Sequence, residues 1–178
     1  EKTGIIVAEG YDYEIIKKAY RPQDDLSLLV TLKANGTIEK TVIGSLAESL
    51  TVDRHDAADW NRLKEIFASN TLQMVSFTIT EKGYSITSPD GAFRADVKAD
   101  FEAGPENADS YIGKLAALCY WRYTQGAAPL ALVSMDNCSH NGDKLFAAVD
   151  AYAKAWTENG KAEKVFLEYI ENPAKVSF

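Results

Sequence analysis

Apolar residues fall along this chain in short strand-like runs separated by amphipathic helical stretches. Residues 4–9 form an unbroken apolar run rich in β-branched residues, which predicts a strand buried on both faces. Compact runs at 73–80 and 130–135 predict two more strands. Apolar side chains recur at helical spacing in residues 56–69 and again after residue 108. The pattern is typical of a folded domain in which strands and helices alternate.

A β-hairpin is predicted in the first quarter of the chain. The runs 26–33 and 37–43 flank Asn35-Gly36, a dipeptide that supplies the positive φ angles of a type I′ turn. Such a hairpin is an excursion from the edge of the main sheet. Residues 92–107, in contrast, have little periodicity and a Gly-Pro breaker, so we expect a loop there.

The last third of the chain predicts a long helix and an apolar end. Four large apolar side chains after residue 141 share one helical face, and Asn159-Gly160 ends the helix: Leu145, Val149, Tyr152 and Trp156. Residues 165–170 suit either a helix or a strand. An order of strand, helix, strand, helix predicts an α/β fold whose mainly parallel sheet has helices on both faces.

Length and both chain ends bear on domain organisation. A chain of 178 residues favours a single domain. It opens directly in a buried-strand pattern and closes in the apolar run 176–178, and domains rarely start or stop inside a strand. We therefore expect segments to be missing at both ends of the domain.

Charge and hydropathy exclude two classes of partner. The formal net charge is -7 and the pI is about 4.9, so the surface repels nucleic-acid phosphates. No apolar run reaches the roughly 20 residues of a membrane-spanning helix, and Glu1–Gly4 show no signal-peptide pattern. We expect a cytoplasmic protein that binds neither nucleic acid nor membrane.

Cysteines and histidines are too few and too scattered for a metal site. Cys119 and Cys138 form no CxxC pair, and His55 and His140 lack partners at i+3 or i+4. Cys119 falls on the apolar face of a predicted helix, which favours a buried structural thiol. We expect no metal.

Candidate chemistry lies where predicted strands end, because ligands of open parallel sheets bind beyond the carboxyl ends of the strands. Glu9, with Asp12, stands where an acidic residue accepts hydrogen bonds from the adenosine ribose and repels the extra phosphate of NADP. Both are equally consistent with solvated loop carboxylates. Thr78, Thr80 and Glu81 follow another strand, where Glu81 beside a lysine is also typical of an ordinary surface.

The third cluster follows the strand at 130–135. Asp136 either stabilises the positive end of the next helix or lines a site, and Ser139 or Asn141 are candidate caps. Asn137 either belongs to that capping segment or presents its amide to a substrate oxygen that gains negative charge. The residues alone leave these alternatives open. No G-x-G-x-x-G, Walker loop, G-x-S-x-G or H-E-x-x-H motif occurs.

Three segments resemble the mannitol dehydrogenase family. Residues 133–137, V-S-M-D-N, followed by Asn141-Gly142, resemble the family's S-C-D-N…N-G, with Met135 as a harmless packing change. Residues 75–84, V-S-F-T-I-T-E-K-G-Y, resemble V-S-L-T-V-T-E-K-G-Y, and residues 41–45 resemble its V-I-G-S segment. The resemblance covers nearly the whole chain and is greatest to the uronate branch, which interconverts D-mannonate and D-fructuronate.

The resemblance implies a Rossmann-like NAD-binding domain over residues 1–178, followed in the family by a mostly helical C-terminal domain. It implies zinc-independent hydride transfer between NAD and a secondary alcohol of a polyol or sugar acid. Asn137 would polarise the reacting oxygen alongside a lysine of the C-terminal domain. Six residues are expected to bind the cofactor: Glu9, Asp12, Thr78, Thr80, Glu81 and Asp136.

The chain departs from the family pattern at both of its ends. The chain starts after the family's first strand and glycine-rich turn and stops before the C-terminal domain, so we expect it to be inactive by itself. The alternative is a self-sufficient, non-catalytic α/β module that binds a small ligand.

Overall fold

A computed structural model describes residues 4–178, which divide into two compact units at the boundary between Asn61 and Arg62. The opening residues 1–3, for which no signal-peptide pattern is expected, lie outside the described part. Within residues 4–178, no helix is long and apolar enough to cross a membrane.

A parallel pair of strands organises the first unit. Strand β1, Ile5–Glu9, pairs with β4, Leu46–Thr51, from Ile5 opposite Leu46 to Glu9 opposite Thr51. The strand predicted at 4–9 is confirmed, but its predicted burial on both faces is wrong, since Ile5 is 56% exposed. The sequence of β4 did not suggest a strand because Leu46 and Leu50 stand four residues apart, as in a helix. Its strand conformation comes from pairing with β1.

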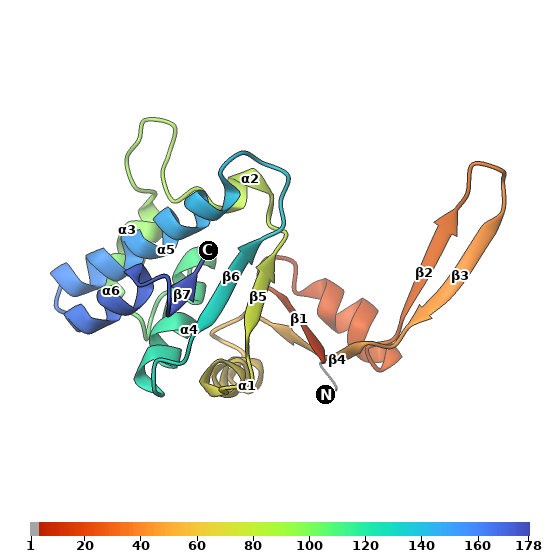
Figure 1. Ribbon diagram of the computed structural model, residues 1–178, viewed down its shortest axis with the longest axis horizontal. Helices are drawn as coiled ribbons and strands as arrows, with labels where there is room; N and C mark the ends of the chain where they lie inside the picture. The colour runs from red at the N-terminus through yellow and green to blue at the C-terminus, as the bar shows by residue number, and fades with distance from the viewer. Residues whose placement is uncertain (1–3) are drawn as a thin grey trace. The chain divides into compact units, whose positions relative to one another are not determined.

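Two short helical turns and a hairpin lie between these strands. Residues Ile16–Tyr20 form a π-helix and Arg21–Gln23 a 3-10 turn. The predicted hairpin is confirmed as β2, Ser27–Leu32, antiparallel to β3, Ile38–Ile43 (Figure 1). Its predicted type I′ turn is wrong, because Gly36 has a positive φ of 81° but Asn35 does not. Cross-strand pairing brings five exposed apolar side chains to one face of the hairpin: Leu28, Val30, Leu32, Ile38 and Val42.

A buried carboxylate fastens the first unit internally. Asp59, in the first turn of α1 (Ala57–Ala68), is 6% exposed and accepts hydrogen bonds from the backbone amide and hydroxyl of Thr51 at 2.8 and 2.7 Å. The guanidinium of Arg21 reaches both of its oxygens, at 2.6 and 2.7 Å. Burial raises the pKa of Asp59, but the Thr51 and Arg21 hydrogen bonds outweigh burial, so this pKa lies below its ordinary value.

Replacing Asp59 with asparagine should lower the stability of the chain at neutral pH by about 1–3 kcal/mol, because Arg21 and Thr51 lose a charged acceptor. A carboxylate whose pKa is depressed on folding stabilises above its unfolded pKa, about 3.9, and loses this contribution as the pH falls through its folded pKa. Urea unfolding of wild type and variant at pH 7 and at pH 3 should therefore give a smaller difference at pH 3. Asp143→Asn, at a side chain that is 83% exposed, is the control. An equal difference at both pH values would contradict the prediction.

Three parallel strands form the sheet of the second unit. Strand β6, Leu130–Ser134, lies between β5, Met74–Phe77, and β7, Val176–Ser177 (Figure 1). The strands predicted at 73–80 and 130–135 are thus confirmed, and the apolar chain end adds a third. This parallel arrangement confirms the expected α/β class.

Within the described residues, helices cover one face of that sheet, not both faces as predicted. Alternate side chains on this face are buried, and these are Phe77, Leu130, Leu132 and Val176, whereas Met74 and Ser76 on the opposite face are exposed. The long helix α5, Asn141–Glu158, and α6, Lys164–Glu171, lie beside β6 and β7. The four residues predicted to form the buried face of α5 are each 0% exposed, and the ambiguous segment 165–170 is helical.

The two longer helices between β5 and β6 in the chain are α3, Ala95–Ala103, and α4, Tyr111–Thr124. Helix α4 is confirmed with Cys119 buried on its apolar face. The loop predicted at 92–107 is wrong, because Ala95–Ala103 form helix α3. Its helical signal was a single apolar pair, Val97 and Phe101, and the Phe101 ring packs edge-on against Tyr152 of α5 at 4.9 Å. Tertiary packing therefore stabilises a helix whose local pattern is weak.

Candidate functional site at the carboxyl ends of the strands

The carboxyl ends of β5 and β6 lie next to each other. Phe77 is the register partner of Ser134, and the Met135 amide donates to the Phe77 carbonyl at 2.8 Å. The segments that follow the two strands therefore start at the same edge of the sheet. This is the position expected for Asp136 and Asn137.

Asp136 ties the two strand ends together. Its carboxylate accepts hydrogen bonds from the backbone amides of Ile79 at 2.9 Å and Thr80 at 3.0 Å, both of which follow β5. It also accepts the hydroxyl proton of Tyr84. The hydrogen bond from Tyr84, aided by the two amides, holds the pKa of Asp136 below its ordinary value despite partial desolvation. Asp136 is thus an ionised acceptor that faces the protein.

Tyr84 was not among the site residues predicted from the sequence. It follows the polar residues 80–83, yet it is only 3% exposed. The short helix α2, Thr80–Gly83, turns the chain back so that the Tyr84 oxygen lies 2.6 Å from the Ser134 hydroxyl. Burial, and then the hydrogen bond to Asp136, raise the pKa of Tyr84 to about 12. Tyr84 therefore stays protonated at neutral pH.

Asn137 presents the free amide at this edge. Its side chain is exposed and forms no hydrogen bond with any residue of the described part, 4–178. Of the two candidate caps, Asn141 accepts a hydrogen bond from the Gly142 amide in the first turn of α5 at 2.8 Å, whereas the N-cap position itself is taken by His140, with φ 55° and no side-chain hydrogen bond. The Asn141 amide also donates to the carbonyls of Asp136 at 2.9 Å and Ser134 at 3.3 Å, which fixes the loop that carries Asn137.

The predicted residues after β5 have different surroundings. Thr78 and Thr80 are exposed, and Thr80 has a φ of 61°, which is unfavourable for a β-branched residue. Glu81 pairs with Lys144 of α5 at 2.5 Å rather than with its neighbour Lys82. This hydrogen bond, and the charge of Lys144, lower the pKa of Glu81.

Glu9 and Asp12 belong to the first unit, at the carboxyl end of β1. One carboxylate oxygen of Glu9, Oε1, accepts from the amides of Tyr11 at 2.8 Å and Asp12 at 3.2 Å. Its second oxygen accepts no hydrogen bond from the residues that the structure describes, and Asp12 is exposed. A carboxylate oriented by its own loop, with an acceptor oxygen to spare, fits the diol of a nucleoside ribose.

The two cysteines and the potential metal-ligating side chains are the remaining candidate site groups. Burial raises the pKa of the Cys119 thiol to about 12, so it is an unreactive core group. Cys138 is half-buried in the loop before α5. Within residues 4–178, no three potential metal-ligating side chains come together.

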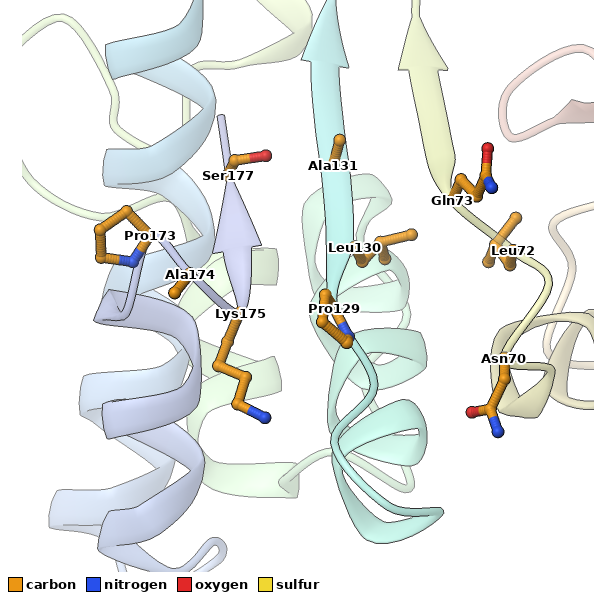
Figure 2. Close-up of a pocket in the computed structure, with 10 residues that line it drawn as sticks. All are labelled: Asn70, Leu72, Gln73, Pro129, Leu130, Ala131, Pro173, Ala174, Lys175 and Ser177. Atoms are coloured by element: carbon orange, nitrogen blue, oxygen red, sulfur yellow. The ribbon is translucent and has the colours of Figure 1, made fainter.

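A hollow of about 390 Å³ lies at the opposite end of the same sheet (Figure 2). It is lined by residues at the amino ends of β5, β6 and β7, among them Gln73, Pro129 and Lys175. Ligands of parallel sheets bind at the carboxyl ends, and Lys175 is its single charged side chain. We therefore place the candidate site at the Asp136 edge.

Two curated proteins show what this chain is similar to. D-mannonate oxidoreductase of Thermotoga maritima is 45% identical over 171 residues, which are 96% of this chain and 32% of that protein. Polyol:NADP oxidoreductase of Gluconobacter oxydans is 33% identical over 78% of this chain and 29% of its own length. The chain thus spans about a third of the length of these relatives. No protein-family model matches the chain.

Two solved structures are similar in fold as well as in sequence. A substrate-free D-sorbitol dehydrogenase superposes with a TM-score of 0.77 at 28% identity, over 99% of this chain and 35% of its own. The mannitol 2-dehydrogenase of Pseudomonas fluorescens, in a ternary complex with NAD and D-mannitol, gives a TM-score of 0.71 at 30% identity. That match covers 92% of this chain and 32% of the dehydrogenase.

Proposed function

The chain belongs to the mannitol dehydrogenase family of polyol and sugar-acid dehydrogenases, and from that premise we propose that it is part of an NAD-dependent oxidoreductase. The whole protein transfers a hydride between NAD and a secondary alcohol. The favoured substrate pair is D-mannonate and D-fructuronate, because the relative that is 45% identical is a D-mannonate oxidoreductase.

One observation carries this proposal: Asn137 holds an exposed amide with no protein partner among residues 4–178, at the carboxyl end of a parallel strand. An amide NH2 in that position donates to the alcohol oxygen of a substrate. The donated hydrogen bond strengthens as the oxygen loses its proton and gains negative charge, so it favours the transition state.

Other residues of the chain orient the cofactor. When bound, NAD supplies the carbon that accepts the hydride. In the first unit, Glu9 accepts hydrogen bonds from the adenosine ribose with its spare oxygen, and its negative charge disfavours the additional phosphate of NADP. Asp12, Thr78, Thr80 and Glu81 are the further cofactor contacts that we propose.

The remainder of the whole protein completes the enzyme. We assign to it the first strand with its glycine-rich turn, and a C-terminal domain with the lysine that acts as general base. Residues 1–178 are accordingly the greater part of the NAD-binding domain and have no turnover alone. The whole protein works in the cytoplasm on small polar substrates, and it binds neither nucleic acid nor membrane.

An assay of the whole protein tests this function. NAD is supplied with D-mannonate, D-mannitol, D-sorbitol and D-arabinitol in turn, and NADH formation is followed by absorbance. We expect turnover with at least one substrate, greatest with D-mannonate, and none with residues 1–178 alone. Saturable substrate binding without NADH formation from any of the four would overturn the proposal and leave a non-catalytic binding module.

A further inference from the structure

A compact hydrogen-bond network joins the ends of β5 and β6, and we call it the Asp136 clamp. It consists of the Asp136 carboxylate, the hydroxyls of Tyr84 and Ser134, and the backbone amides of Ile79 and Thr80. Oδ1 of Asp136 accepts from Thr80, and Oδ2 accepts from Ile79 and Tyr84. Both oxygens therefore accept from the protein, and the clamp uses most of the acceptor capacity of the carboxylate that was expected to contact the cofactor.

The buried side chain of Tyr84 donates a hydrogen bond to this carboxylate. The phenol proton is donated to Asp136, so the Ser134 hydroxyl, 2.6 Å away, donates its own proton to the phenol oxygen. A chain of donors runs from β6 through Tyr84 to Asp136. Tyr84 is 3% exposed, which keeps water from competing for these bonds.

The clamp holds a strained backbone. Thr80 has a φ of 61°, a left-handed conformation that is unfavourable for a β-branched residue. Just beyond it, a Cβ on Gly83 would lie 2.8 Å from Ile79, so the loop is folded tightly on itself. Such strain persists only where surrounding contacts enforce it, and it gathers at functional sites. Here the enforcing contacts are the two hydrogen bonds that the backbone amides of Ile79 and Thr80 donate to Asp136.

We propose that Asp136 and Tyr84 are positioning residues for hydride transfer: the clamp fixes the Thr80 loop and Asn137 at one edge of the sheet. This proposal rests on the proposed function. Asn137 follows Asp136 directly, so anchoring the Asp136 side chain fixes the direction in which the Asn137 amide points. Neither Asp136 nor Tyr84 exchanges a proton with substrate.

A positioning role predicts an effect on kcat rather than on binding. Misplacement of a catalytic group by about 1 Å can reduce a rate by up to about 10²-fold. Tyr84→Phe removes the hydroxyl that donates to Asp136 and leaves the hydrogen bonds from the two backbone amides. We therefore expect kcat to fall about tenfold, an intermediate loss on that scale. KM for the sugar acid and the Kd for NAD should stay within about twofold, because a donor that acts mainly in the transition state contributes little to ground-state binding.

The matched control is Tyr169→Phe. Tyr169 is 5% exposed and donates one hydrogen bond, to the Ala128 carbonyl at 2.8 Å, which precedes the amino end of β6 and is away from the carboxyl ends of the strands. Both variants lose a buried hydroxyl and should show similar decreases in Tm. Of these two variants, only Tyr84→Phe should have a lower kcat, whereas a purely structural role of Tyr84 would give equal kcat values in the two variants.

The experiment measures kcat, KM, Kd for NAD and Tm in the whole protein for wild type, Tyr84→Phe, Tyr169→Phe and Asp136→Asn. Asp136→Asn puts an amide group against the backbone donors, and its kcat should fall further than that of Tyr84→Phe while NAD is still bound. Turnover in both clamp variants equal to that of Tyr169→Phe overturns the positioning role and leaves the proposed function intact. Absence of hydride transfer in wild type overturns the proposed function, and the positioning role with it.

Discussion

Replacing Arg122 with alanine should lower the free energy of unfolding of this chain by about 3–5 kcal/mol, because several buried backbone carbonyls lose their donor at once. Arg122 of α4 is 1% exposed. Its guanidinium donates to five backbone carbonyls at 2.6–3.0 Å, namely those of Phe67, Ser69, Leu72, Ala128 and Pro129. No carboxylate forms an ion pair with it in the described part of the chain.

The expected loss is large because the five carbonyls come from two connections that lead into the sheet. One runs from the end of α1 to β5, and the other from α4 to β6. Removing the guanidinium leaves buried acceptors without donors, and each such group costs about 1–3 kcal/mol when no water reaches it. Lysine offers no planar fork, so Arg122→Lys should recover only part of the loss.

Urea unfolding, followed by far-ultraviolet circular dichroism, measures this effect. Arg62→Ala is the matched control, because the Arg62 side chain is 45% exposed and pairs with Glu65 on the surface. Exposed pairs of this kind contribute about 0–1 kcal/mol. A change of less than about 1 kcal/mol in Arg122→Ala would contradict the argument that the guanidinium organises both connections.

Replacing Asn137 with alanine in the whole protein should lower kcat by about 10²-fold or more, the effect of removing one donor to a developing oxyanion. The exposed amide of Asn137 has no protein hydrogen bond among residues 4–178, so its loss should leave Tm unchanged. Asn137→Asp keeps the size of the side chain but replaces the donor with a negative charge. Its kcat should fall at least as far.

Ser139→Ala is the control for Asn137. Ser139 is exposed in the same loop, and no hydrogen bond of its hydroxyl is present in the described residues. Steady-state kinetics with NAD and D-mannonate should give a kcat close to wild type for this variant. If Asn137→Ala retained a third or more of the wild-type kcat, Asn137 would be a loop residue without a catalytic role.

Prediction from the sequence succeeded where the local pattern was strong. The apolar face of α5 and the hairpin around Asn35-Gly36 each follow from a few residues close together in the chain, although the type of the turn was predicted wrongly. No strand was predicted at the position of β4, and the loop predicted in place of α3 was wrong. The spacing of Leu46 and Leu50 suits a helix, and α3 offers only one apolar pair, so distant partners determine both elements.

For the candidate site, too, the sequence indicated some of the residues and not others. Asp136 and Asn137 were identified because they follow a clear strand, and the structure places both at the expected edge of the sheet. Tyr84 was missed, since five polar or small residues around it suggested an exposed loop. Its hydroxyl meets Asp136, 52 residues away, only after β5 and β6 have paired.

By itself, the sequence determined which segments are strands and helices with an apolar face, because hydrophobic periodicity is a local property of the chain. The tertiary structure alone decided what the polar side chains do. Asp59, Arg122 and Asp136 each bind groups that lie far away in the sequence. A buried polar group is stable only with a partner, and folding determines which partner comes within reach.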